Sequence, residues 1–372
     1  MRIVGEWINK FKKLLCALGE ANETEKMIPI KGAHISGVSY RNIGDVGREF
    51  LYDVVSEGLK VRVHTTCNPG YTKEGEEDLQ DRIYHNFIML GCEESFTCTP
   101  YYLNRKIKCG DVLSWAESSA VVYANSVLGV RTNRESGITA LASAILGYTP
   151  LYGLLRSEER RPWVRIKIKW RDIDEKKAGL LGYYIGEKIG RVPFIEGILL
   201  TEEEFKYLGA AIATASDISI VHVKGLTKEH KWASKYEMHT IEMKGEELRE
   251  VEEKLSQTEG GEAVILGCPH LSFNELREIA EATSQIRRVK KRALLFTSRA
   301  VYSTALSMGY IEKLRRKGFE IYTDSCVMCK YVEELEEVYT NSVKAAFYLY
   351  NRMGIRSCLK STREIIQEVL LG

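Results

Sequence analysis

Three cysteines follow predicted β-strands in parts of the chain that lie far apart. The segments are FTCTP around Cys98, ILGCPH around Cys268 and IYTDSC around Cys326. Ligands of α/β proteins collect where the strands of a parallel sheet end, so we expect the three thiols to meet in one cleft. Cysteine thiolates are the usual ligands of iron–sulfur clusters. The pattern therefore predicts a cluster held at three corners, with one iron open to a substrate.

The remaining cysteines do not form a secreted disulfide framework. The chain has 9 cysteines, an odd number, so we expect free or metal-bound thiols in a reducing compartment. Cys329 forms a C-x-x-C pair with Cys326, and Cys67 follows another predicted strand, so both are additional candidate ligands. Zinc modules usually bring two such pairs, which makes zinc the less favoured metal. Three others are expected to be small core residues: Cys16, Cys109 and Cys358.

Three polar motifs in the first half of the chain are candidates for binding a charged ligand. HISGVSY (34–40) offers amides and hydroxyls suited to a carboxylate or phosphate. TTCNPG (65–70) follows a predicted strand, and WAESSA (115–120) places a carboxylate and two hydroxyls at a predicted helix start. Each motif alone is equally compatible with a turn or a helix cap. Their joint occurrence favours a binding site.

Alternating strand-like and helical segments predict an α/β fold with mostly parallel sheets flanked by helices. Strand-like runs occur at residues 60–66, 163–170, 193–199, 218–224, 262–266, 292–297 and 319–323. Residues 76–90 have helical periodicity, and capping-box spacing at Thr201 and Ser272 starts helices just beyond strands. The charged segment 156–161 and the Gly-rich segment 257–262 are the candidate boundaries. They divide the chain into units at residues 1–160, 161–260 and 261–372.

Composition argues against nucleic acid and membrane as partners. The 53 Lys and Arg nearly balance the 51 Asp and Glu. The net charge therefore creates no strong positive potential that would attract a polyanion. No apolar run reaches the roughly 20 residues that span a bilayer. The first residues lack a signal-peptide core and predict an amphipathic helix of a cytoplasmic protein. A distant alternative, an iron-sensing RNA-binding protein, would rest on the basic runs 165–171 and 286–292, which do not interleave aromatic residues for base stacking.

Several motifs together resemble the aconitase X family. They are HISGVSY (34–40), TTCNP (65–69), TCTPY (97–101), WAESSAVVYANS (115–126), RTNR (131–134) and TDSC (323–326). The resemblance extends over nearly the whole chain and implies an aconitase-like large unit of three α/β/α lobes around a central cleft. Many bacterial members also carry a small swivelling domain, which archaeal members have as a separate chain. Because this chain ends at Gly372 without that domain, the resemblance implies a small partner subunit.

The resemblance also implies a site and a reaction. A [4Fe-4S] cluster would be held by Cys98, Cys268 and Cys326, with Cys329 and Cys67 as extra candidates. Substrate contacts would fall on Gly37, Val38, Ser39, Asn68, Pro69, Glu117, Ser118 and Lys344. Glu117 and Ser118 would be catalytic, Glu117 by orienting the hydroxyl or donating its proton, and the base is expected on the partner subunit.

The implied reaction is dehydration of mevalonate 5-phosphate, a tertiary 3-hydroxy acid, to the anhydro product. Dehydration of another hydroxy acid such as cis-3-hydroxy-L-proline is the alternative. The phosphate requires cationic or amide donors. The candidates are the amides of residues 37–39 and the side chains of Arg131, Arg134 and Lys344.

Overall fold

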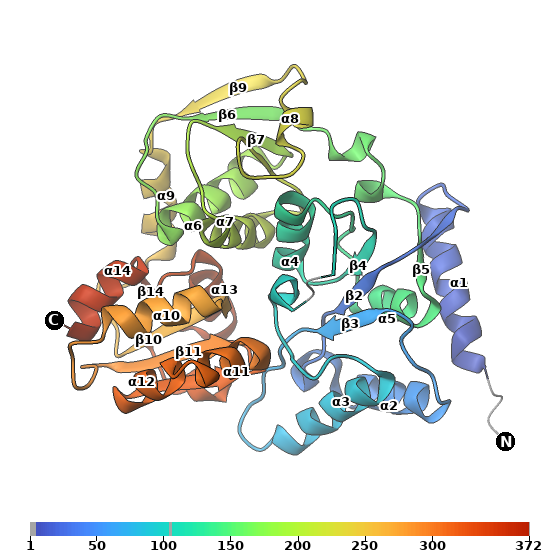
Figure 1. The fold of residues 1–372 in the computed structure, drawn as a ribbon, viewed down its shortest axis with the longest axis horizontal. Coiled ribbons are helices and arrows are strands. Elements are labelled where there is room, and N and C mark those ends of the chain that lie inside the picture. The colour runs from blue at the N-terminus through green and yellow to red at the C-terminus, as the bar shows by residue number, and fades with distance from the viewer. Residues whose placement is uncertain (1–4, 104–105, 372) are drawn as a thin grey trace.

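The computed structural model describes residues 5–103 and 106–371, which form three α/β units in chain order (Figure 1). The helices are α1 (Glu6–Ala21), α2 (Tyr40–Ser56), α3 (Glu77–Leu90), α4 (Ser118–Tyr123), α5 (Gly137–Leu146), α6 (Glu175–Tyr184), α7 (Glu202–Ala215), α8 (His230–Ala233), α9 (Glu247–Leu255), α10 (Phe273–Ala282), α11 (Arg299–Ser307), α12 (Tyr310–Arg316), α13 (Val343–Met353) and α14 (Thr362–Glu364). The strands are β1 (Met27–Pro29), β2 (Gly32–Ile35), β3 (His64–Cys67), β4 (Leu113–Trp115), β5 (Tyr148–Pro150), β6 (Val164–Ile168), β7 (Pro193–Glu196), β8 (His222–Val223), β9 (His239–Met243), β10 (Ala263–Leu271), β11 (Arg292–Thr297), β12 (Phe319–Thr323), β13 (Glu337–Thr340) and β14 (Arg356–Leu359).

The N-terminal unit is built on a parallel sheet of order β3-β2-β4, beside the antiparallel pair β1-β5. Helices α2 and α3 pack together, and α5 packs against β2 and α1. Phe11, Leu51 and Phe87 belong to the buried core of this unit. Because β2, β3 and β4 run in the same direction, the segments that follow them leave the sheet at one edge.

The middle unit has a parallel sheet of order β8-β7-β6-β9. Figure 1 shows α6 and α7 between this sheet and the C-terminal unit. Helix α4 of the N-terminal unit packs against α7, and Val121 and Leu208 share one hydrophobic core. The middle unit therefore supports the helix that begins at Ser118.

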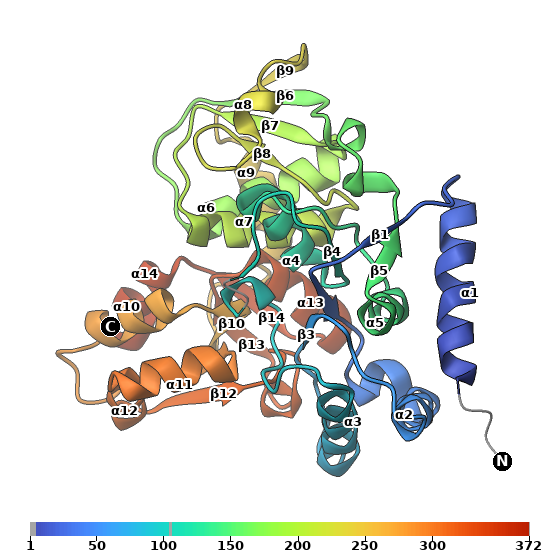
Figure 2. The same ribbon diagram turned by 45° about the vertical axis from the view of Figure 1, so that its right-hand side comes forward.

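The C-terminal unit has a five-stranded parallel sheet of order β12-β11-β10-β13-β14. Its central strand β10 begins with the buried run Ala263, Val264, Ile265 and Leu266, as expected for a parallel strand covered on both faces. Figure 2 shows α13 near the centre of the molecule, where the units meet. This helix carries Lys344 in its first turn.

The predicted α/β class with parallel sheets is confirmed. Segments 292–297 and 319–323 coincide with β11 and β12, and capping boxes start α7 and α10. Four strand predictions were too long, those for residues 60–66, 163–170, 193–199 and 218–224. Strand β3 begins only at His64, because Val61 and Arg62 donate their amides to carbonyls in α3 and α5. In segment 218–224 only β8 forms.

The predicted first helix corresponds to α1, which begins at Glu6. Residues 1–4 of that prediction lie outside the described residues. Within the described ranges, no helix has both the length and the apolar character needed to cross a membrane.

Candidate functional site

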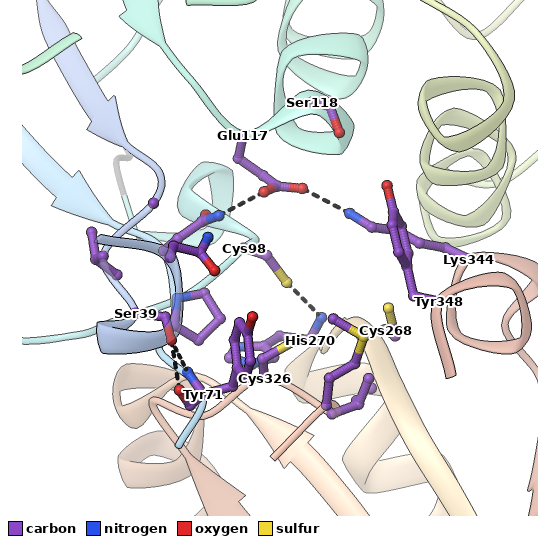
Figure 3. A pocket seen from close by; sticks show the side chains of 18 of the residues that line it. Ser39, Tyr71, Cys98, Glu117, Ser118, Cys268, His270, Cys326, Lys344 and Tyr348 are labelled. Carbon is purple, nitrogen blue, oxygen red and sulfur yellow. Dashed lines mark hydrogen bonds and ion pairs between the residues drawn. The ribbon is translucent and has the colours of Figure 1, made fainter. Parts of the chain in front are cut away.

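One cavity of about 200 Å³ is lined by residues of the N-terminal and C-terminal units (Figure 3). Segments after β2, β3 and β4 supply one side, and β10, the segment after β12 and α13 supply the other. All predicted substrate residues and the three main predicted ligands line it: Gly37, Val38, Ser39, Asn68, Pro69, Cys98, Glu117, Ser118, Cys268, Cys326 and Lys344. The fold therefore brings the three polar motifs and three thiols into one space.

An ion pair between Glu117 and Lys344, whose side chains are 12% and 13% exposed, lies at the side of the cavity opposite Cys268 and Cys326. Lys344 Nζ is 2.7 Å from Glu117 Oε1, and the Ser119 hydroxyl donates to the same oxygen at 2.8 Å. Burial alone would raise the pKa of Glu117, but the charge of Lys344 and these hydrogen bonds lower it to about 2. Burial alone would lower the pKa of Lys344, but the facing carboxylate raises it above its usual range. Both groups are therefore charged at neutral pH.

Asn68 connects Glu117 to the parallel sheet. Its Nδ2 donates to Glu117 Oε2 at 2.6 Å, and its Oδ1 lies 2.7 Å from Nε2 of His34. His34 is buried in β2, and its Nδ1 lies 2.7 Å from the Thr66 hydroxyl. Because the amide oxygen only accepts, His34 must carry its proton on Nε2 and accept from Thr66 at Nδ1. The orientation of the carboxylate is thus fixed from β2 and β3.

The 37–39 loop is held by Gln80, which sequence analysis did not single out, and by the hydroxyl of Ser39 itself. Gln80 of α3 donates to the Val38 carbonyl at 2.9 Å and accepts from the Tyr40 amide at 2.8 Å. The Ser39 hydroxyl donates to the Tyr71 carbonyl at 2.5 Å. Gly37 has a φ of +72°, a conformation that favours glycine. These contacts fix the loop against the side of the cavity.

The prediction that three cysteines follow strands is wrong for two of them. Cys98 follows Phe96, which forms only an isolated bridge with Cys67. Cys326 does follow β12, which ends at Thr323. Although only Cys326 follows a regular strand, all three thiols reach the cavity.

Cys268 lies inside β10, where the pairing with β11 changes register between Leu266 and Leu271. The irregularity begins at Gly267, which has a φ of +114°. A Cβ there would lie 2.2 Å from the carbonyl oxygen of Phe296, so only glycine fits. The resulting bend places Cys268 in the lining of the cavity.

The chemistry of the three thiols fits an iron–sulfur cluster. Burial raises the pKa of Cys98 to about 12 and raises those of Cys268 and Cys326, whereas the charge of Lys344 acts in the opposite direction on all three. Metal ligation replaces such thiol protons. In the described part of the chain, no three His, Cys, Asp or Glu side chains are arranged to hold one metal ion. A cluster bonds its cysteines through different irons, so its ligands need not meet at one point.

The two extra candidate ligands lie outside the cavity lining. Cys67 is buried in the core of the N-terminal unit, and Cys329 is buried in that of the C-terminal unit. Among the cysteines expected in the core, Cys358 is buried but Cys16 and Cys109 are exposed. The expectation is wrong for Cys16 because that residue lies on the outer face of the amphipathic helix α1.

Models of the three aconitase X domains match almost the whole chain. The first domain matches residues 4–158, the second residues 162–253 and the third residues 261–370. The chain belongs to the aconitase X family. The crystal structure of the holo-form of Thermococcus kodakaraensis aconitase X is similar to this chain, with a TM-score of 0.92 and 37% identity, covering 97% of this chain and 95% of that one.

Relatives within aconitase X carry two kinds of name. The phosphomevalonate dehydratase large subunit of Thermococcus kodakarensis is 38% identical over 98% of this chain and 97% of its own length. That of Methanocaldococcus jannaschii is 37% identical over 93% of this chain and 91% of its own length. The cis-3-hydroxy-L-proline dehydratase of Pseudomonas aeruginosa is 30% identical over 94% of this chain and 65% of its own length.

Other lining residues of this aconitase X chain were missed by sequence analysis. They include Asn42, Tyr71, His270, Tyr348 and Arg352. Tyr348 and Arg352 follow Lys344 at steps of four, the spacing of one helix face, so this signal was present in the sequence.

Two arginines expected to bind phosphate lie outside the cavity lining. Arg131 donates to the Leu155 carbonyl at 3.1 Å and to the Ser157 hydroxyl at 2.9 Å. Arg134 donates to the Ser216 carbonyl at 3.1 Å. Both guanidinium groups make contacts between chain segments, so the structure offers no support for these two candidates as phosphate donors.

Proposed function

We propose that this chain is the large, catalytic subunit of a phosphomevalonate dehydratase. The enzyme removes water from mevalonate 5-phosphate and gives the anhydro product, an α,β-unsaturated acid. The observation that carries the proposal is one cavity in which three thiols face the Glu117–Lys344 ion pair. Relatives named phosphomevalonate dehydratase large subunit, similar over nearly their full length, support the substrate.

The cofactor in this proposal is a [4Fe-4S] cluster on Cys98, Cys268 and Cys326. Three thiols from separate parts of the chain and a nearby lysine that favours their ionised form support this assignment. When bound, such a cluster supplies a Lewis acid that eases departure of the substrate hydroxyl. Cys329 and Cys67 are not included, because their side chains are buried outside the cavity lining.

Glu117 and Lys344 would orient the substrate beside the thiols. With a pKa of about 2, Glu117 holds no proton to give at neutral pH, so we favour its role as acceptor of a hydrogen bond from the substrate hydroxyl. Lys344 donates to Glu117 and, at 3.3 Å, to Ser119. An ammonium has three donors, so its third N–H can bind the substrate carboxylate and stabilise the charge that develops there. Ser118 lines the cavity next to Glu117 and remains a candidate contact.

The substrate phosphate would bind to Arg352 and Asn42 at the wall of the cavity. Both side chains line the cavity. A guanidinium and a side-chain amide are suitable phosphate donors. cis-3-Hydroxy-L-proline has no phosphate, so these groups favour the phosphorylated acid.

We further propose that a small partner subunit supplies the catalytic base. Among the described lining residues, Glu117 pairs with Lys344, and His270 forms hydrogen bonds through both ring nitrogens. Neither is free to take the proton next to the substrate carboxylate. The relatives named large subunits support a partner of this kind.

The test is a dehydration assay on the complex of this chain with its small subunit, purified without oxygen. Mevalonate 5-phosphate and cis-3-hydroxy-L-proline are offered separately, and iron and acid-labile sulfide are measured on the same sample. We expect turnover of the phosphate ester only, with iron and sulfide in equal amounts. Turnover of hydroxyproline alone would overturn the proposed substrate, and zinc without sulfide would overturn the proposed cofactor.

A further inference from the structure

His270 contacts the segments that carry all three cavity cysteines. It lies at the end of β10, two residues after Cys268, and its side chain is buried. Its backbone N–H donates to Cys98 Sγ at 3.3 Å, the contact drawn in Figure 3. Its ring reaches the residues that precede Cys98 and Cys326: Nδ1 lies 3.0 Å from the Thr97 hydroxyl, and Nε2 lies 2.9 Å from the Ser325 carbonyl oxygen.

The partners of His270 determine its tautomer. A carbonyl oxygen only accepts, so the ring proton must lie on Nε2 and be donated to Ser325. Nδ1 then accepts the hydroxyl proton of Thr97. The Thr97 oxygen in turn accepts the Thr99 amide at 3.1 Å, which fixes the turn around Cys98. One neutral imidazole therefore holds two loops at a defined separation.

The backbone of His270 is anchored from the middle unit. Lys206 of α7 is buried, and its Nζ donates to the His270 carbonyl at 3.2 Å. Lys206 also pairs with Glu275 at the start of α10. These contacts restrict the backbone between Cys268 and α10. The position of the His270 ring relative to the loops of Thr97 and Ser325 is therefore fixed.

We propose that His270 is a positioning residue that sets the mutual placement of Cys98, Cys268 and Cys326, so that the three thiols form a preorganised receptor for the cluster. The proposal rests on the proposed function, because it requires these thiols to bind the cluster. Groups behind metal ligands commonly orient them in this way, and their loss weakens metal binding about 10- to 100-fold.

The variants His270→Ala and His270→Gln test this proposal in the complex with the small subunit. Alanine leaves the Ser325 carbonyl and Thr97 hydroxyl without their partner, whereas glutamine retains a donor and an acceptor on one side chain. The measurements are iron and sulfide per complex after anaerobic reconstitution, and the rate at which a chelator removes the iron. We expect His270→Ala to lose iron about 10- to 100-fold faster and His270→Gln to recover part of the difference.

His222→Ala is the matched control. His222 is also buried, and its Nε2 lies 2.8 Å from the Arg160 carbonyl, but it belongs to the middle unit and does not line the cavity. We expect His222→Ala to lower the thermal stability of the metal-free complex about as much as His270→Ala does. Its iron retention should equal that of the natural complex. Equal retention in the natural complex and both His270 variants would overturn the role of His270. A natural complex that takes up no iron and sulfide would instead overturn the proposed function, and this inference with it.

Discussion

Glu117 and Lys344 are 227 positions apart in the chain, yet their charged atoms lie 2.7 Å apart in a mostly buried ion pair. Glu117 caps α4 of the N-terminal unit, and Lys344 lies in the first turn of α13 in the C-terminal unit. The pair therefore connects the two units at the cavity. Lys344 holds the pKa of Glu117 at about 2, which keeps the carboxylate ionised against the effect of burial.

We predict that Glu117→Gln will abolish most of the activity without a large change in shape. Losing the oriented carboxylate should lower kcat about 100-fold through misplacement of the substrate. The change also leaves Lys344 as a buried unpaired charge, which should destabilise the fold by about 3–5 kcal/mol. Steady-state kinetics and chemical denaturation measure the two effects separately. Unchanged kcat would contradict the assigned role.

The double variant Glu117→Gln with Lys344→Met separates charge burial from catalysis. Because neither charge remains, the free energy of unfolding should return most of the way to that of the natural chain. The dehydration activity should stay low. Recovery of activity together with stability would show that Glu117 acts only on the fold.

Arg352→Gln should raise KM for mevalonate 5-phosphate about tenfold, since a hydrogen bond to a charged group contributes about 1.5–3 kcal/mol. The matched control is Arg134→Gln, because Arg134 lies outside the cavity lining and donates to the Ser216 carbonyl. The KM of the Arg134→Gln variant for mevalonate 5-phosphate should be unchanged. If Arg134→Gln raised KM and Arg352→Gln did not, the phosphate would bind elsewhere.

His34 should make the fold less stable in mild acid. Burial lowers the pKa of His34 to about 4, whereas an unfolded histidine titrates near about 6.5. Between these two pH values the unfolded chain therefore binds more protons than the folded chain. The contribution of His34 to the free energy of unfolding is complete above about pH 6.5 and is lost as the pH falls toward 4. At pH 5 the loss is about 2 kcal/mol.

His34→Gln removes this titration, so the difference in free energy of unfolding between pH 7 and pH 5 should shrink by about 2 kcal/mol. Urea denaturation of both proteins at the two pH values measures it. An equal pH dependence in both proteins would show that His34 does not titrate as its burial indicates.

Ser342 should stabilise the site beyond its role as a helix cap. It caps α13 by accepting the Ala345 amide at 3.0 Å, and its hydroxyl donates to the Cys268 carbonyl. Ser342→Ala should cost about 1 kcal/mol as a lost cap and also lower iron content. Ser298 also caps a helix, α11, by accepting the Val301 amide, so Ser298→Ala should cost similar stability and leave iron content unchanged. Equal iron content in the two variants would contradict this second role.

Local patterns in the sequence predicted β11, β12 and the capped starts of α7 and α10, because each depends on a few adjacent residues. The same reasoning failed where distant groups take the backbone hydrogen bonds. The sequence around Val61 and Arg62 predicts a strand. No strand forms there, because the carbonyls that accept their amides lie in α3 and α5. Cys268 could not be placed locally, since the bend at Gly267 is inside β10.

In the candidate site, too, the sequence predicted some features and missed others. Motifs and family resemblance located many of the lining residues, including Glu117 and the three cysteines. The contacts of His270 with Thr97 and Ser325 depend on how β10 and two loops fold together, and no spacing in the sequence encodes them. The RTNR motif contributed to the family resemblance, but its arginines bond to backbone carbonyls outside the cavity lining.

The most direct test of the central claim is the iron and acid-labile sulfide content of four alanine variants, each in the anaerobic complex with the small subunit. Cys98→Ala, Cys268→Ala and Cys326→Ala should lose most of both, together with dehydration of mevalonate 5-phosphate. Cys329→Ala should retain them, because Cys329 is buried outside the cavity lining. Full iron and sulfide in any of the first three variants, or their loss in Cys329→Ala, would contradict the account.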